Sequence, residues 1–218
     1  MNKQLNDVTL IAYDTRPEKI NDTILGMQKC CEKIDFASAK LLTDIEPESL
    51  PENITWEYAP HINNINDFNL YVFSELGTHV ETSHALYVQD HAYILHPELW
   101  DDNWLQYSYI GAPWPIIENS YLTDSGERVR IGNGGFSLRS RELMFAPRVL
   151  GLKLEQRQGW FNEDGNLTIY HKDKLLKYGI KYAPIEVGAI FSYENPVSEN
   201  NFGNMKTFGF HRNHRENE

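Results

Sequence analysis

The stretch Val8-Thr9-Leu10-Ile11-Ala12-Tyr13 reads as a short apolar run near the start of the chain. A run of this kind is typical of a strand that is covered on both faces of a sheet. Behind it, apolar residues recur at three- and four-residue steps between Ile20 and Ile34, which predicts an amphipathic helix. Thr15 and Glu18 have the spacing of a capping box at the start of that helix.

Further elements follow in a regular order. Strands are predicted over residues 39–42, 54–58 and 85–89, and a helix over 65–76 that ends at Gly77. This order of strands and helices predicts a doubly wound α/β unit, in which ligands bind beyond the carboxyl ends of the strands. The residues expected there are Asp14-Thr15 after the first strand and Gln89-Asp90-His91 after the fourth. Later in the chain, a strand is expected at Ser137 and helices near 140 and over 172–178.

Length and composition restrict the kind of protein. A chain of 218 residues fits one domain, and its net charge of −11 disfavours a broad interface with nucleic acid. No signal peptide or run of about 18 apolar residues is found, so we expect a cytoplasmic protein without a membrane span. Cys30 and Cys31 are neighbours on a helix, a poor geometry for a disulfide; Cys31 is expected to pack in the core and Cys30 to be incidental.

Two segments carry residues suited to binding a nucleotide. The carboxylate and imidazole of Asp90 and His91 can hold a divalent cation, although such residues after a strand are often only turn residues. The three glycines between Gly132 and Gly135 allow unusual dihedral angles and a close approach of backbone amides to a substrate. The alternative for this run is a glycine-rich turn without a ligand.

Two more segments offer reactive side chains. Glu163 and Asp164 lie in a polar loop, where a carboxylate can deprotonate an acceptor hydroxyl; a solvated acidic pair is the simpler interpretation. His211 follows Phe208-Gly209-Phe210 and can act as a metal or phosphate ligand.

Taken in order, these segments resemble a family of glycosyltransferase-like proteins described only as a domain of unknown function. The family pattern runs Q-x-D-G-[YF], Y-D-Y-I-G-A-P-W, G-N-G-G-[FL]-S-L-R-[SR], H-E-D, F-S-x-E and F-G-F-H. The resemblance covers nearly the whole chain, from Val8 to His211. The matching segments of this sequence are Gln89–Tyr93, Tyr107–Trp114, Gly132–Arg139, Asn162–Asp164, Phe191–Glu194 and Phe208–His211.

The resemblance implies a single-domain GT-A-type fold, a Rossmann-like mixed sheet flanked by helices, with a nucleotide-sugar-binding half near 1–115 and an acceptor-binding half near 116–218. It implies a nucleotide-sugar donor and a divalent cation, Mn²⁺ or Mg²⁺, with metal ligands at Asp90, His91 and His211. It implies a catalytic carboxylate at Asp164 or Glu163. The residues implied to bind the nucleotide-sugar are Asp14, Thr15, Gln89, Asp90, Trp114, Asn133, Gly134, Gly135 and Arg139.

The sequence departs from the pattern at three positions. His91 stands where the family has the aspartate of Q-x-D, Ser108 replaces the aspartate of Y-D-Y, and Asn162 replaces the histidine before the acidic pair. Histidine binds Mn²⁺ but adds no negative charge, so the metal site is the part of the resemblance most altered by these changes.

The leading hypothesis is therefore an inverting glycosyltransferase that uses Asp164 or Glu163 as its base. A non-catalytic nucleotide- or carbohydrate-binding module derived from such an enzyme is the alternative. The expected acceptor is a glycan. A modified nucleobase in DNA is the less favoured acceptor, and it would need a local rim of basic residues, for which the sequence offers Arg128, Arg130, Arg139, Arg141, Arg212, His214 and Arg215.

Overall fold

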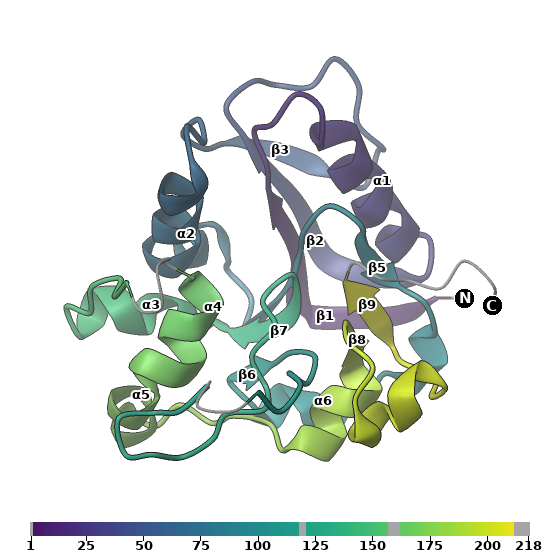
Figure 1. The fold of residues 1–218 in the computed structure, drawn as a ribbon. Helices are drawn as coiled ribbons and strands as arrows, with labels where there is room; N and C mark the ends of the chain where they lie inside the picture. Colours follow the sequence, from purple (N-terminus) through teal and green to yellow (C-terminus); the bar gives the residue numbers. More distant parts are fainter. Residues whose placement is uncertain (1, 118–120, 157–161, 212–218) are drawn as a thin grey trace.

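A six-stranded mixed sheet forms the centre of the structure, a computed structural model that describes residues 2–117, 121–156 and 162–211 (Figure 1). A smaller three-stranded sheet lies beside it. The strands are β1 Lys3–Tyr13, β2 Ile34–Thr43, β3 Thr55–Tyr58, β4 His84–Val88, β5 Ala92–Ile94, β6 Tyr109–Ile110, β7 Phe136–Ser140, β8 Ser192–Tyr193 and β9 Gly209–His211.

Helices cover both faces of the large sheet. Single helical turns connect several of the elements. The α-helices are α1 Ile20–Cys31, α2 Ile65–Ser74, α3 Arg141–Val149, α4 Glu163–Gly165, α5 Lys172–Tyr178 and α6 Ile185–Phe191; the turns are the 3₁₀ segments η1 Leu76–His79, η2 Pro97–Leu99, η3 Asp102–Gln106 and η5 Ser198–Gly203, and the π-helical η4 Asn166–Tyr170.

The strand order β3-β2-β1-β4-β7-β6 makes the large sheet parallel on one side and antiparallel on the other. Strands β1 to β4 run parallel to one another, and β7 pairs antiparallel with both β4 and β6. The order turns back between β1 and β4, which is the point where open α/β sheets bind their ligands. The mixed single-domain α/β architecture that the sequence predicted is thus confirmed.

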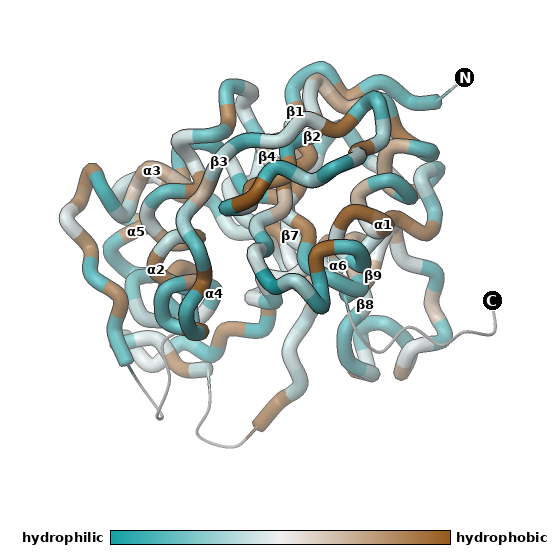
Figure 2. Tube along the Cα trace, turned by 90° about the horizontal axis from the view of Figure 1, so that it is seen from above, coloured by the Kyte–Doolittle hydropathy of each residue, from teal (hydrophilic) through white to brown (hydrophobic). Residues whose placement is uncertain are grey.

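The core follows directly from the period-two alternation of the strands. Leu10 and Ala12 of β1 pack in one cluster with Met27 of α1, whereas Ile11 and Tyr13 pack in another with residues of α2. In Figure 2, apolar residues run along the strands in the middle of the molecule. The first strand is therefore covered on both faces, as its unbroken apolar run predicted.

Several predicted boundaries and caps are corrected. Strand β2 begins at Ile34, so α1 is shorter and β2 longer than predicted. The capping box is not formed: the Thr15 hydroxyl accepts a hydrogen bond from the amide of Ile62 (2.8 Å), and α1 has no side-chain cap at its start. Cys30 is completely buried rather than incidental, because the face of α1 that packs on the sheet includes it as well as Cys31.

Other local predictions are confirmed. The side chain of Ser140 accepts a hydrogen bond from the amide of Leu143 and caps α3 (3.1 Å). Helix α5 spans Lys172–Tyr178 and ends at Gly179, which has a left-handed conformation. Within the described residues, no helix is both long and apolar enough to cross a membrane.

Candidate functional site

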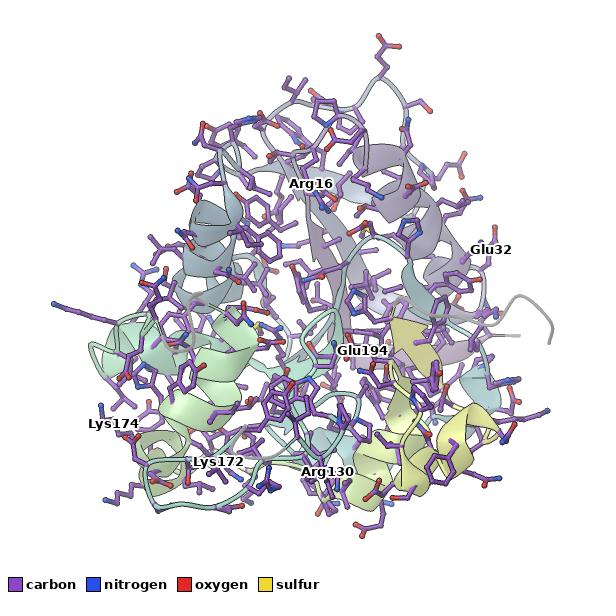
Figure 3. The ribbon with its side chains drawn as sticks, in the orientation of Figure 1. Arg16, Glu32, Arg130, Lys172, Lys174 and Glu194 are labelled. Carbon is purple, nitrogen blue, oxygen red and sulfur yellow. The ribbon has the colours of Figure 1, made fainter. Side chains whose placement is uncertain are left out.

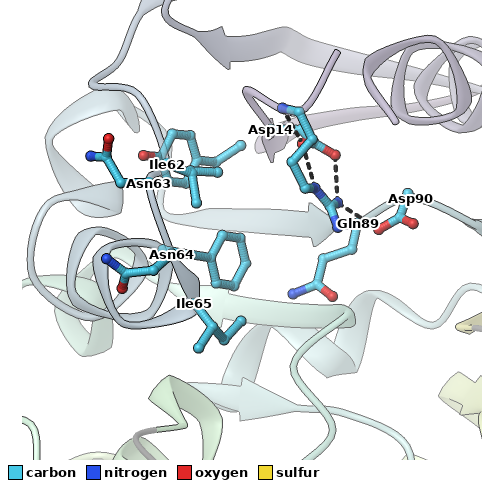
Figure 4. A pocket seen from close by; sticks show the side chains of 10 residues that line it. Asp14, Ile62, Asn63, Asn64, Ile65, Gln89 and Asp90 are labelled. Carbon is cyan, nitrogen blue, oxygen red and sulfur yellow. Dashed lines mark hydrogen bonds and ion pairs between the residues drawn. The ribbon is translucent and has the colours of Figure 1, made fainter. Parts of the chain in front are cut away.

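A cavity of about 320 Å³ opens at the carboxyl ends of β1 and β4. On one side it is lined by Asp14, Gln89 and Asp90, and on the other by the loop that leads into α2 (Figure 4). This is the point at which the strand order turns back, so the cavity lies where a doubly wound sheet is expected to bind its ligand. Its lining residues are Tyr13, Asp14, Arg16, Ile62, Asn63, Asn64, Ile65, Phe68, Gln89 and Asp90.

An aromatic group forms one wall of this cavity. The rings of Tyr13 and Phe68 are nearly parallel, with centroids 5.8 Å apart, and Tyr71 lies against Tyr13 at 4.4 Å. The Tyr13 hydroxyl donates a hydrogen bond to the carbonyl of Pro60 (2.7 Å), and burial raises the pKa of this tyrosine. Flat aromatic and apolar surfaces of this kind suit a planar heterocycle.

Arg16 joins the two strand ends by bridging their carboxylates. Its Nε and Nη2 donate to the two oxygens of Asp14 (2.8 and 2.7 Å), and Nη2 also donates to Oδ1 of Asp90 (2.9 Å). Asp14 is almost completely buried and accepts a further hydrogen bond from the Thr23 hydroxyl (2.9 Å). Burial by itself raises the pKa of Asp90, but the hydrogen bond and charge of Arg16 outweigh it and lower the pKa below the usual value.

Lys19 completes this group of charges. Its Nζ lies 3.5 Å from Oδ2 of Asp90 and 3.3 Å from Nε2 of His91. We call Asp14, Arg16, Lys19 and Asp90 the arginine-bridged cluster. Sequence reasoning singled out its two carboxylates and missed its two cations, although both cations follow the first strand within a few residues.

The glycines of the run are required because neighbouring side chains lie against their backbone, and not because they adopt unusual dihedral angles. None of Gly132, Gly134 and Gly135 is among the described residues with positive φ. A Cβ on Gly132 would meet the ring of Trp114, and one on Gly135 would meet the ring of His211. The expectation of unusual dihedrals is therefore corrected: the glycines are needed because neighbouring side chains pack directly on the backbone.

Gly134 lies against the acidic pair. Its amide donates a hydrogen bond to Oδ2 of Asp164 (3.2 Å), and its missing Cβ leaves room for Glu163 and Arg139. One residue later, the carbonyl of Gly135 accepts a hydrogen bond from the amide of Gln89 (2.9 Å). The glycine run thus connects Asp164 to the strand end that lines the cavity.

The two acidic residues have different surroundings. Glu163 is buried and forms an ion pair with Arg139, whose side chain is 0% exposed, at 2.8 Å. Arg139 also donates to Ser137 and to the carbonyl of Gly134, and its guanidinium lies over the ring of Tyr87. Arg139 and Glu163 therefore form an internal ion pair that uses Nη2 of the guanidinium, while Nη1 is buried without a hydrogen-bond partner.

Asp164 is less completely buried than Glu163. Its two oxygens accept hydrogen bonds from the amides of Gly134 and Gly165. Burial, followed by the negative charge of Glu163, raises the pKa of Asp164 well above the usual value for an aspartate. A carboxylate with a raised pKa is suited to accept a proton in catalysis, so Asp164 is the better candidate base of the pair.

His211 lies on the other side of the glycine run. It is 3% exposed; its Nδ1 lies 3.4 Å from Oε1 of Glu194 and 3.4 Å from Nδ2 of Asn133. Nε2 of His211 and Oδ1 of Asn133 are buried without a hydrogen-bond partner. We call Asn133, Gly134, Gly135, Asp164 and His211 the glycine-run site. Glu194, which contacts His211, and Arg16 of the arginine-bridged cluster are labelled in Figure 3.

The three predicted metal ligands do not form a cation site. Asp90 and His91 both contact the ammonium of Lys19, and Nε2 of His91 also lies 3.8 Å from the carboxylates of Asp22 and Asp90. The ring of His211 instead faces Glu194 and Asn133. Within the part of the chain that the structure describes, no group of three histidine, cysteine or acidic residues could hold a metal ion. The residues at this position therefore do not fit a divalent cation.

The remaining predicted residues have structural contacts. Thr15 holds the loop at Ile62 against the cavity, and Trp114 packs on Gly132 and stacks on Tyr121 with centroids 4.6 Å apart. Two residues of the predicted basic rim have other roles. Arg139 is buried, and Arg130 forms an ion pair with Glu199 at 3.0 Å. Arg212, His214 and Arg215 lie outside the described residues.

Sheet order, helix placement and cavity together define a GT-A-type glycosyltransferase fold. The galactosyltransferase LgtC, solved with donor and acceptor sugar analogues, superposes with a TM-score of 0.52 at 11% identity, over 95% of this chain and 90% of that one. A structure of an active-site mutant of LgtC gives a TM-score of 0.55 at 12% identity, over 95% and 88% of the two chains. The apo form of the glycosyltransferase GlyE of Streptococcus pneumoniae TIGR4 gives a TM-score of 0.52 at 10% identity, over 99% of this chain and 55% of that one.

Residues 52–211 match the family described as "Protein of unknown function (DUF5672)". The chain therefore belongs to this family. A comparison with curated proteins finds no match.

Proposed function

We propose that this protein is a glycosyltransferase that moves a sugar from a nucleotide-sugar donor to a hydroxyl group of a glycan. The observation that carries the proposal is the backbone connection through the glycine run. It joins a candidate base, Asp164, to the strand end at Gln89 that lines a cavity with an aromatic wall. The GT-A-type fold supports the same class of reaction.

The donor nucleotide binds in the cavity. Its base lies against Tyr13 and Phe68, and its ribose lies near the strand end at Asp14. From there the diphosphate passes the strand end at Asp90 and the sugar extends toward Gly134 and Gly135. Support for this orientation comes from the position of the cavity at β1 and from the continuity of backbone between Gln89 and the glycine run.

Asp164 acts as the general base in an inverting transfer. The acceptor hydroxyl oxygen forms a bond with the anomeric carbon while its proton passes to the Asp164 carboxylate. The bond between the anomeric carbon and the diphosphate oxygen breaks, and the nucleoside diphosphate leaves with the electron pair. Glu163 does not take part in proton transfer, because Arg139 and the amide of Asp164 already use its two oxygens.

A glycan acceptor is favoured over DNA by the charge of the chain. The net charge is −11, and the two arginines nearest the glycine run on either side are paired internally, Arg130 with Glu199 and Arg139 with Glu163. A phosphate backbone therefore finds no cluster of free cations among the described residues of this segment.

The proposal is tested by incubating the protein with a panel of nucleotide-sugars and oligosaccharide acceptors, and measuring release of nucleoside diphosphate. We expect acceptor-dependent release with one donor, and a product whose anomeric configuration, read by NMR, is opposite to that of the donor. Retained configuration would contradict the role given to Asp164. Tight donor binding without release for any acceptor would support the non-catalytic binding module instead.

A further inference from the structure

An ammonium group lies between the two atoms that a metal ion at this strand end would use. Lys19 Nζ is 3.5 Å from Oδ2 of Asp90 and 3.3 Å from Nε2 of His91. A divalent cation bound by both atoms would occupy much the same region, and its charge would repel that of Lys19. The lysine therefore stands in the region expected for the metal.

The second oxygen of Asp90 is also taken by a cation. Oδ1 accepts a hydrogen bond from Nη2 of Arg16 at 2.9 Å, and the same guanidinium is held by two hydrogen bonds to Asp14. Arg16 is fixed at this position because Asp14 is buried and loses its counter-charge if the arginine leaves. Both oxygens of Asp90 are thus paired with side-chain cations.

Both cations keep access to solvent; Arg16 lines the cavity, and Lys19 contacts Asp90, which also lines it. The side chain of Arg16 is 40% exposed and that of Lys19 is 34% exposed, whereas Asp14 and Asp90 are 2% and 8% exposed. The hydrogen bonds of Arg16 to Asp14 and Asp90 run through Nε and Nη2 of its side chain. The two buried carboxylates therefore hold two partly exposed cations in place, ready to meet an anionic ligand.

We propose that Arg16 and Lys19 bind the diphosphate of the donor directly, without a divalent cation. This inference rests on the proposed function and names the groups that hold its leaving group. Arg16 offers a fixed fork suited to phosphate oxygens, and Lys19 adds a second positive charge. They stabilise the charge that develops on the diphosphate as the sugar leaves.

The first test is calorimetric titration of the wild-type protein with UDP, GDP, ADP, CDP and dTDP, in EDTA and again in excess MnCl₂. We expect one of these nucleotides to bind with the same Kd in both buffers. A Kd about tenfold or more tighter with Mn²⁺ than with EDTA, a difference of about 1.4 kcal/mol, would overturn the inference and leave the proposed function intact. Binding of none of these nucleotides in either buffer would count against the proposed function itself, and the inference would fall with it.

The second test removes one cation at a time. Lys19→Gln is expected to weaken binding in EDTA roughly tenfold to a hundredfold, because one charge-assisted hydrogen bond is lost. Lys29→Gln is the matched control: it makes the same charge change in the helix that follows Lys19, where Lys29 lies over the ring of Tyr93 at 4.1 Å, away from Asp90. We expect its Kd to equal that of the wild type. Equal binding by Lys19→Gln and wild type would overturn the inference.

Arg16 is tested with two substitutions, because the buried Asp14 needs a counter-charge. Arg16→Lys keeps the charge and loses the fork, and Arg16→Gln loses both. We expect the Kd to rise in the order wild type, Arg16→Lys, Arg16→Gln, with circular dichroism showing that the variants are folded. A folded Arg16→Gln protein that binds as tightly as the wild type would contradict a direct contact with the diphosphate.

Discussion

The arginine-bridged cluster and the glycine-run site lie on either side of Gln89, and they handle buried polar groups in opposite ways. In the cluster, each carboxylate oxygen is paired with Arg16, Lys19 or a hydroxyl, and two cations remain partly exposed. In the glycine-run site, Nε2 of His211 and Oδ1 of Asn133 are buried without partners.

On the function proposed above, this difference assigns donor binding to the cluster and proton transfer to the glycine-run site. A paired cluster holds its cations in fixed positions and binds a preformed anion at little cost in ordering. Unpaired buried polar atoms are costly in a folded protein, and two of those in the described residues, on Asn133 and His211, lie at the glycine run. Asp164 belongs to the glycine-run site as well. Burial and the charge of Glu163 disfavour its charged form, which raises its pKa and makes the carboxylate a stronger proton acceptor.

The largest effect is expected from Asp164→Asn. Loss of a general base lowers kcat by roughly 10²- to 10⁴-fold, while nucleotide binding in the cavity is unchanged. The measurement is acceptor-dependent release of nucleoside diphosphate, together with the Kd of the nucleotide. Asp173→Asn is the control, since Asp173 binds Ser125 at the start of α5, and it should retain wild-type rates. An active Asp164→Asn protein would remove the distinction between the two regions.

The next largest effect is on stability, and it distinguishes Glu163 from Asp164. Glu163→Gln leaves the fully buried Arg139 without its counter-charge and is expected to destabilise the fold by about 3–5 kcal/mol. Chemical denaturation of this variant and of Asp164→Asn measures the contrast. If Glu163→Gln is as stable as the wild type, the ion pair is not the internal support described above.

A smaller loss of stability is expected from Gly135→Ala. The added methyl group meets the ring of His211, so the backbone or the ring must move, at a cost of roughly 1–3 kcal/mol. His211→Ala removes the ring that the new methyl group would meet. Adding Gly135→Ala to His211→Ala should therefore cost less stability than adding it to the wild type. Additive effects in this double-mutant cycle would show that the glycine is needed for another reason.

The smallest effect is a displaced pH dependence. The base acts only when deprotonated, so kcat/KM is expected to fall by about tenfold per pH unit below the pKa of Asp164. Because burial and Glu163 raise that pKa, the fall begins at a higher pH than for an ordinary aspartate, whose pKa is about 3.9. In Glu163→Gln, assayed under conditions where it is folded, the fall of kcat/KM should begin at a lower pH than in the wild type. If the fall begins at the same pH in both proteins, a group other than Asp164 causes it.

The same pKa fixes the sign of one contribution to stability. The folded protein holds the Asp164 proton more tightly than the unfolded chain does. This contribution is therefore complete below the unfolded pKa and declines as the pH rises toward the raised folded value.

Local sequence patterns predicted the elements that depend on neighbouring residues. The apolar run of the first strand, the Ser140 cap and the stop at Gly179 are each decided within a few residues, and each is found. The order of these elements was enough to predict a mixed α/β fold. The same kind of reasoning failed for the capping box, because Thr15 binds a loop at Ile62 that is distant in sequence.

The sequence by itself determined which segments carry polar groups to the ends of the strands, namely Asp14, Gln89–His91 and the glycine run; it placed the acidic pair in a loop, whereas Glu163 and Asp164 begin α4. Only the tertiary structure decided how these groups are paired. It buried Arg139 against Glu163, turned His211 toward Glu194 and brought Lys19 between Asp90 and His91. Such pairings join residues from different elements, so they depend on strand order and helix docking, and a pattern of neighbouring residues does not record them.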